Sequence, residues 1–111
     1  DVFAGFGLTV VRMTCEEHDR EAAYSQALTH FVGRSLYRIG LPETPIATRW
    51  YKKLHGVAKQ CVRDSHLLFE DMQNLNPYAS EMRRRVLQGF ADTLKDLGDN
   101  LELQFLEELH D

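Results

Sequence analysis

The 111-residue sequence lacks the features that mark several common classes of protein. Its only two cysteines, Cys15 and Cys61, show no Cys-x-x-Cys spacing, which argues against a disulfide scaffold or a zinc knuckle and fits a reducing compartment. No apolar run approaches the roughly 20 residues of a membrane span, and no signal-peptide pattern is visible. Acidic residues outnumber basic ones, 17 to 13, and the basic residues are scattered, which disfavours a nucleic-acid surface. We therefore expect a cytoplasmic protein without nucleic-acid or membrane partners.

The composition is that of one ordinary domain, since 43% of the residues are hydrophobic and 27% are charged. The segment 6–13 is β-branched and strand-like, but it has no second strand to pair with. The rest of the chain has helical periodicity. We expect an all-α domain of about four to five helices, with one long N-terminal and one long C-terminal helix, plus this short strand-like segment.

The first helix has clear start and stop signals. Thr14 and Glu17 form a capping box, in which the hydroxyl covers a free backbone N–H and the carboxylate reaches back to the cap. Gly40 suits the position after a helix end, and Pro42 follows it. The helix is therefore predicted to run from the capping box to about Ile39.

Drawn as a regular helix, this segment has three faces. The charged face, expected to be solvated, consists of Glu16, Arg20, Arg34 and Arg38. The opposite face is built from mostly small residues, namely Ala22, Ser25, Thr29, Val32, Gly33 and Leu36. A polar stripe beside it contains Asp19, Gln26, His30 and Tyr37. The helical wheel alone favours polar groups satisfied at a helix–helix contact, with ligand binding as the alternative.

Two helices are predicted in the middle of the chain. Thr44-Pro45 fits the cap and first residue of one, although Thr48 would cap a later start. Asp64 or Ser65 caps the next, which gives a bend near residues 62–65. The core stripe of the first of these helices is Trp50, Leu54, Val57 and Cys61.

The last helix is predicted to open at Asn76-Pro77 and to carry a long apolar stripe. This stripe consists of Met82, Val86, Phe90, Leu94, Leu97, Leu101, Phe105 and Leu109. It continues through Gly98, so we expect either one bent helix or two nearly collinear ones. At about 1.5 Å per residue it spans roughly 40 Å, more than one small domain covers easily. We therefore predict a two-fold homodimer with a helical interface.

The motif Met-Thr-x-Glu-Glu-His-Asp at residues 13–19, followed by Gln-Ala-Leu-Thr-His-Phe at 26–31, resembles the start of the C-terminal domain of prephenate and arogenate dehydrogenases. Weaker matches at Gly33-Arg34, Pro45-Ile46, Asp64-Ser65 and Phe69 are similar to the plant-type arogenate enzymes. These are NAD(P)-dependent enzymes of tyrosine biosynthesis. The resemblance implies that residues 1–13 are the tail of a preceding nucleotide-binding domain or a linker, and that residues 14–111 form a helical dimerisation and substrate-pocket domain.

The resemblance also implies a division of labour between the two domains. In the family, hydride passes from the substrate ring to NAD or NADP while the ring loses CO₂. The cofactor and catalytic residues are expected mainly in the preceding domain, because Gly5-Phe6-Gly7 lacks the third glycine of a dinucleotide motif. We expect this chain to hold no catalytic, cofactor-binding or metal-binding residue. Alone, it should form dimers without reducing NAD(P)⁺.

The positions that match the family motif supply the expected substrate site. His18, Gln26 and His30 are expected to bind prephenate or arogenate, with Asp19 and Phe69 in supporting roles. Gln26 is a plausible donor to a substrate carboxylate or side chain.

Two departures from the family pattern affect this expectation. Prephenate enzymes commonly carry an arginine near the position of Gly56, and many have a tryptophan where this chain has Phe69. Lys53, Lys59 or Arg63 are alternative cations, and their spacing does not choose among them. The choices between prephenate and arogenate, and between NAD and NADP, therefore stay open.

Two other functions were weighed. The chain fits a non-catalytic, all-helical dimeric interaction module that keeps the fold without the chemistry. A metal-dependent hydrolase built on His18-Asp19 needs further ligands converging from other helices, and the remaining histidines do not repeat as such sites require. The dehydrogenase domain is the favoured hypothesis.

Overall fold

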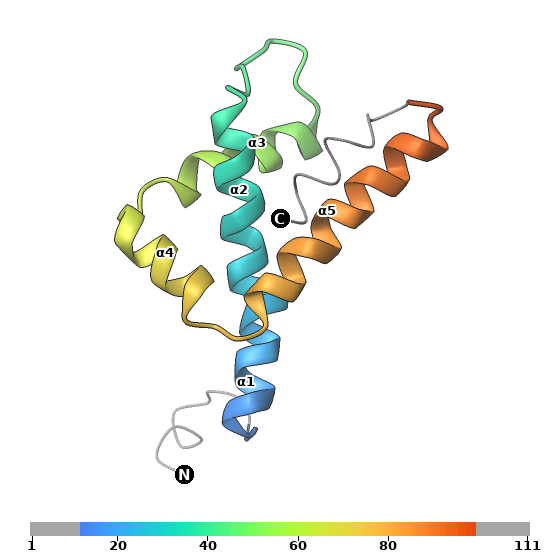
Figure 1. Ribbon diagram of the computed structural model, residues 1–111. Coiled ribbons are helices and arrows are strands. Elements are labelled where there is room, and N and C mark those ends of the chain that lie inside the picture. Colours follow the sequence, from blue (N-terminus) through green and yellow to red (C-terminus); the bar gives the residue numbers. More distant parts are fainter. Residues whose placement is uncertain (1–11, 100–111) are drawn as a thin grey trace.

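The computed structural model describes residues 12–99 and confirms an all-α fold for that part of the chain, in which every regular element is a helix (Figure 1). The elements are α1 (Cys15–Ala22), η2 (Ala23–Ala27), α2 (Leu28–Arg38), α3 (Arg49–Cys61), α4 (His66–Asn74) and α5 (Ala79–Asp96). Most of the predicted strand-like segment 6–13, and the continuation of the last helix over residues 100–111, lie outside the described residues.

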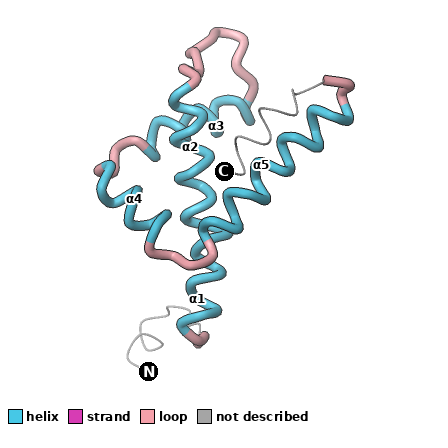
Figure 2. Tube along the Cα trace, viewed as in Figure 1, coloured by secondary structure: helices cyan, strands magenta, loops and turns pink. Residues whose placement is uncertain are grey.

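The helices α1, η2 and α2 follow one another as one long rod, against which the other helices lie (Figures 1 and 2). The predicted capping box is confirmed: Thr14 Oγ1 accepts from the Glu17 N–H at 3.1 Å, and Glu17 Oε2 accepts from the Thr14 N–H at 3.4 Å. Gly40 ends the rod with a φ of 71°, which a side chain would strain. The local signals therefore placed both ends of this helix correctly.

A π-helical turn, η2, interrupts the rod and was not predicted from the sequence. The Leu28 N–H donates to the carbonyl of Ala23, five residues earlier, so the turn holds one extra residue. One residue corresponds to about 100° of rotation, which changes the faces of everything that follows. The predicted charged face was therefore wrong at Arg34, which is half-buried, while Glu16, Arg20 and Arg38 are exposed as predicted.

The small-residue face was also displaced. Ser25 and Thr29, expected in the contact, are exposed, and their hydroxyls donate to the carbonyls of residues 21 and 25. The rod buries Gly33 as predicted, together with Ala23 and Ala27, which were not on the predicted face.

For each of the two middle helices the sequence offered two possible caps, and each helix begins at the second of them. Thr48 caps α3 by accepting from the Tyr51 N–H, while Thr44 heads a separate turn upstream. Ser65 caps α4 by accepting from the Leu68 N–H at 3.0 Å, and the predicted bend lies between the two helices.

The last helix begins near the predicted position, while its predicted continuation to Leu109 lies outside the described residues. Asn76 caps a turn ahead of α5, since its Oδ1 accepts from the Tyr78 N–H, and the helix itself starts at Ala79, slightly later than predicted. It ends at Asp96, where Gly98 has a φ of 79° and the Asp99 N–H donates to the Leu94 carbonyl. The helix therefore stops at this glycine.

The core is small and lies where α3, α4 and the start of α5 meet the rod. Its buried apolar residues are Ala23, Ala27, Ala58, Cys61, Ala79 and Met82. The radius of gyration is 17.4 Å, against about 13 Å for a compact domain of this length. The reason is visible in Figure 1, where α5 diverges from α2 and α3 towards its C-terminal end. Among residues 12–99, the C-terminal end of α5 therefore lies away from α2 and α3.

Candidate functional site

His30 is the predicted site residue that the structure places in the most site-like surroundings. It lies one turn into α2, and its side chain is 22% exposed. Its Nδ1 is buried without a hydrogen-bond partner and lies 3.8 Å from Oδ2 of Asp64, in the bend between α3 and α4. A buried polar atom without a partner is uncommon in folded proteins.

A shallow groove of about 590 Å³ lies beside His30, between α2 and α3. Lys53, Gly56, Val57 and Cys61 line it on the α3 side. Its walls are mostly apolar. Its titratable groups are the His30 imidazole, the Lys53 ammonium and the Cys61 thiol. This combination of an apolar wall with a few polar groups is the usual make-up of a small-molecule site.

Of the three alternative cations, Lys53, Lys59 and Arg63, Lys53 is the one that lines this groove. It lines the groove together with Gly56. Its Nζ lies 4.7 Å from the centre of the Trp50 ring. Lys59 lines a different cavity, with Tyr37 on the other side of α3. Lys53 is therefore the cation that the fold brings next to His30.

His18 and Gln26 do not join this groove. His18 lies in the first turn of α1 with a side chain that is 71% exposed, and its Nδ1 is 3.8 Å from Asp19 Oδ1. Gln26 is exposed on the π-helical turn. The Asp19 carbonyl accepts from Asn76 Nδ2 at 2.8 Å, so Asp19 helps to join the rod to the segment before α5. The three predicted substrate-binding residues, His18, Gln26 and His30, thus lie in three different surroundings.

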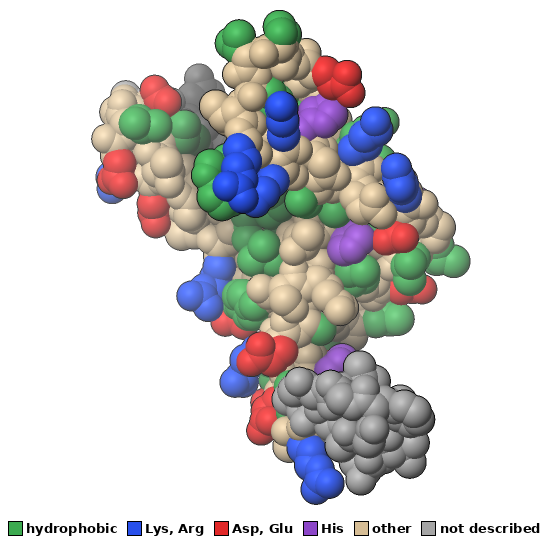
Figure 3. Space-filling model, turned by 180° about the vertical axis from the view of Figure 1, so that it is seen from behind, with side chains coloured by type: hydrophobic (Ala, Val, Ile, Leu, Met, Phe, Trp, Pro, Cys, Tyr) green, Lys and Arg blue, Asp and Glu red, His purple; other side chains and the backbone are tan. Residues whose placement is uncertain are grey.

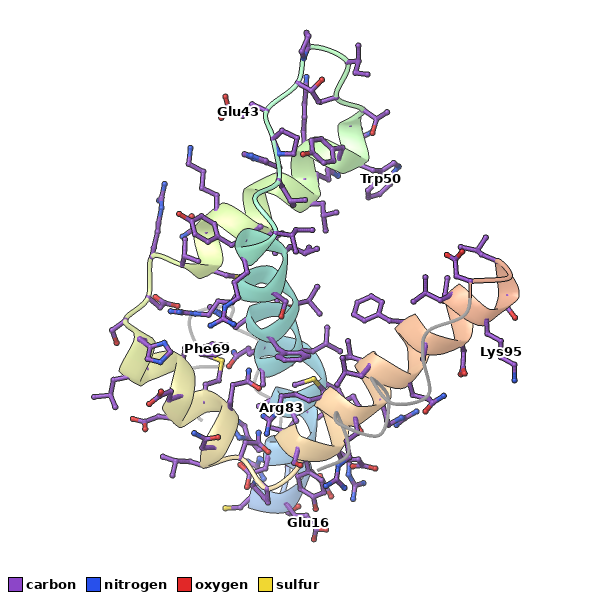
Figure 4. The ribbon with its side chains drawn as sticks, turned by 45° about the horizontal axis from the view of Figure 1, so that its top comes forward. Glu16, Glu43, Trp50, Phe69, Arg83 and Lys95 are labelled. Atoms are coloured by element: carbon purple, nitrogen blue, oxygen red, sulfur yellow. The ribbon has the colours of Figure 1, made fainter. Side chains whose placement is uncertain are left out.

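Phe69 has a cationic neighbour that the sequence did not reveal. It projects from α4 towards α2 (Figure 4), and the Arg34 guanidinium lies 4.5 Å from the centre of its ring. Arg34 also donates to the backbone carbonyl of Asp64 at 2.8 Å. Asp64 therefore contacts two residues of α2, through its carboxylate and its carbonyl. The sequence indicated Asp64 as a possible helix cap and as part of the match to the plant-type enzymes, but it did not predict either contact.

The buried thiol beside the groove is a packing group rather than a nucleophile. Burial, and next the charge of Asp64, raise the pKa of Cys61. The thiolate is the reactive form of cysteine, so a raised pKa keeps this sulfur inert near neutral pH. Its Sγ lies 3.7 Å from the Thr29 carbonyl, across the contact between α2 and α3.

The other titratable groups do not gather into a metal centre. Within residues 12–99 no group of three or more histidines, cysteines or carboxylates is placed to hold a metal ion. The histidines visible in Figure 3 are separated from one another on that face. No helix in the same range is long and apolar enough to cross a membrane.

Comparison with known proteins agrees with the motifs in the first helix. The family model described as "TYRAAT1-like, C-terminal domain" matches residues 35–109. Arogenate dehydrogenase 2, chloroplastic, from Arabidopsis thaliana is 34% identical over 108 residues, which are 97% of this chain and 30% of that protein. Arogenate dehydrogenase 1, chloroplastic, from the same plant is 38% identical over 109 residues, which are 98% of this chain and 17% of that protein.

The chain thus spans less than a third of the length of either relative. Both relatives are named as chloroplastic, and the cytoplasmic location expected for this chain stays a prediction. The family model covers well over half of the chain, and the two relatives match nearly all of it. This chain therefore belongs to the family of C-terminal domains of arogenate and prephenate dehydrogenases.

Proposed function

We propose that this chain is the substrate-binding and dimerisation domain of an NAD(P)-dependent arogenate or prephenate dehydrogenase, which oxidatively decarboxylates its substrate in tyrosine biosynthesis. The observation that carries the proposal is the partly buried His30 beside Asp64, in an apolar groove that also holds Lys53. Both named relatives are arogenate dehydrogenases, which favours arogenate as the substrate.

In this proposal His30 binds the substrate and Asp64 orients it. A carboxylate near Nδ1 favours the tautomer with its proton on that nitrogen, so Nε2 becomes a hydrogen-bond acceptor. The substrate ring carries a hydroxyl that is a suitable donor. Gln26 and His18 are kept as outer contacts, because both are exposed and free to meet a ligand or a second domain.

Lys53 is proposed to bind a carboxylate of the substrate. Arogenate and prephenate carry one carboxylate on the ring and one on the side chain. Gly56 leaves room for it, since a Cβ built there meets no atom within 4 Å. A lysine one turn earlier then takes the place of the arginine that related enzymes commonly carry near Gly56. An ammonium–carboxylate hydrogen bond in a mostly apolar groove is stronger than one in open water.

The described residues do not fit the nicotinamide cofactor. Dinucleotides bind at a glycine-rich turn between a strand and a helix, and residues 12–99 contain helices but no strand. We therefore assign NAD or NADP binding to a nucleotide-binding domain, as in the family, and derive no chemical step from this chain alone. Its own residues bind and orient the substrate.

The test uses an enzyme in which this chain follows a nucleotide-binding domain of the family. His30→Ala and Lys53→Ala should each raise the KM for arogenate about 10- to 100-fold with a smaller change in kcat, because a hydrogen bond to a charged or oriented group is removed. Lys52→Ala is the matched control, since Lys52 is the neighbouring exposed lysine and does not line the groove. Unchanged kinetic constants in both site variants would overturn the assignment.

The dimer is proposed from exposed apolar surface on α3 and α5. On the α5 stripe Met82 is 0% exposed, whereas Phe90 is 55% and Leu97 is 72% exposed, with Leu94 half-buried between them. On α3, Trp50 is 74% exposed and projects on the side where the end of α5 lies (Figure 4). Exposed apolar area of this extent typically marks an interface. A second copy buries both stripes at once by a two-fold contact.

Light scattering at micromolar concentration should give twice the chain mass. Trp50→Glu and Phe90→Glu should shift it to the monomer, because each places a charge in the buried interface. Leu75→Glu is the control, since Leu75 is equally exposed but lies at the end of α4. A monomeric mass for the unaltered chain would contradict the dimer.

A further inference from the structure

A second cavity, of about 590 Å³, lies between α2 and α4 and shares no lining residue with the His30 groove. The cavity is lined by aromatic rings of Phe31, Tyr37 and Phe69 and by the cations Arg34 and Arg38. The proposed function uses none of these residues to bind substrate.

Arg34 is the central residue of this cavity, and its hydrogen bonding is incomplete. One terminal nitrogen donates to the Asp64 carbonyl at 2.8 Å, and the guanidinium lies over Phe69. Its Nε is buried and has no partner; among the described residues only His30 Nδ1 shares this condition. A guanidinium has five N–H donors, and leaving one buried and unpaired costs about 1–3 kcal/mol. This Nε–H is therefore a donor that an acceptor entering the cavity can pair with.

The charges around Arg34 favour an anion. Arg38 lies one turn further along α2 on the same wall. The nearby carboxylate of Glu70 is paired with His66 Nε2 at 2.7 Å, and the carboxylate of Asp64 faces His30. Both acidic groups thus have other partners, and the two guanidinium groups keep their charge available to a ligand.

The shape favours an anion with a flat apolar part. A guanidinium stacked on a ring presents its edge for a two-pronged contact with a carboxylate or phosphate. The aromatic walls then suit a planar body of small-molecule size. We propose that this cavity binds a small aromatic molecule that bears a carboxylate or phosphate, at a site separate from the His30 groove. The inference does not depend on the proposed function, because the cavity and the His30 groove share no lining residue.

The experiment follows amide and arginine Nε–H signals of the 111-residue chain by NMR during titration with benzoate and, separately, with inorganic phosphate. Benzoate should give saturable shifts in α2 and α4, including the Arg34 Nε–H, and phosphate alone should bind more weakly if the aromatic walls contribute. Arg34→Lys should weaken benzoate binding about tenfold, because the two-pronged contact and the stacking are lost.

Two further variants keep the result interpretable. Arg38→Gln alters an exposed residue that leaves the fold intact, and it should also weaken binding. Arg84→Gln, on the exposed face of α5, should leave binding unchanged. The proposal is overturned if neither probe gives saturable shifts, if the shifts centre on the His30 groove, or if Arg34→Lys and Arg38→Gln bind as well as the unaltered chain.

Discussion

Replacing Gly33 by alanine should destabilise the domain, although the same change elsewhere in a helix usually stabilises it. Gly33 is buried in α2, where it faces Cys61 of α3. A Cβ built there lies 2.5 Å from Sγ and 2.9 Å from Cβ of Cys61. Both distances are shorter than any real contact of this kind, and the Cys61 side chain is short and buried. The two helices must therefore move apart to admit one methyl group.

The magnitude follows from two opposing terms. Alanine is favoured over glycine in a helix by about 1 kcal/mol. Inserting a methyl group into a packed contact costs about 1–3 kcal/mol in strain, and here the obstacle lies at the base of a side chain. The strain should exceed the helix-propensity gain, so Gly33→Ala should lower the free energy of unfolding by up to about 2 kcal/mol.

Gly89→Ala is the matched control for this prediction. Gly89 is also inside a helix, α5, but a Cβ built there meets no atom within 4 Å. It should therefore raise the free energy of unfolding by up to about 1 kcal/mol. Urea unfolding followed by circular dichroism measures both values. If Gly33→Ala stabilises the chain as much as Gly89→Ala does, the close packing of α2 on α3 is wrong.

Three further predictions test the packing and the ionisation of other residues. Gln73→Leu should lower the free energy of unfolding by about 1–3 kcal/mol, because the buried amide donates to the Ala27 carbonyl and accepts from Arg83. The control Gln88→Leu, at an exposed position, should change it by less than about 0.5 kcal/mol. Equal effects of the two substitutions would contradict this role of Gln73. A thiol reagent near neutral pH should modify the exposed Cys15 well before the buried Cys61. The reactivity of Cys61 should rise only above the ordinary thiol pKa of 9.0. Equal rates for the two thiols at pH 7 would refute the burial of Cys61. The hydrogen bond from Tyr78 to Glu16 raises the pKa of Tyr78. The contribution of this hydrogen bond to stability is therefore present below pH 10 and is lost as the pH rises further. Unfolding measured as a function of pH should show this alkaline loss in the unaltered chain and not in Tyr78→Phe.

The sequence by itself determined the helical class and most helix ends. The capping box at Thr14, the caps at Thr48 and Ser65, and the stop at Gly40 depend on atoms within a few residues of one another. Such signals act locally and can be read from spacing alone. The family motif was also readable, because it is a pattern along one segment.

Only the tertiary structure decided which side chains share a site. The π-helical turn rotates α2 relative to α1, and its Ala27 carbonyl is bound by Gln73, which lies 46 residues later. That rotation buries Arg34, and the bend at Asp64 then brings a carboxylate to His30. A helical wheel assumes one constant rotation per residue, and it carries no information about contacts between distant segments. The pairing of His30 with Asp64 and the placement of Lys53 beside them therefore required the folded chain.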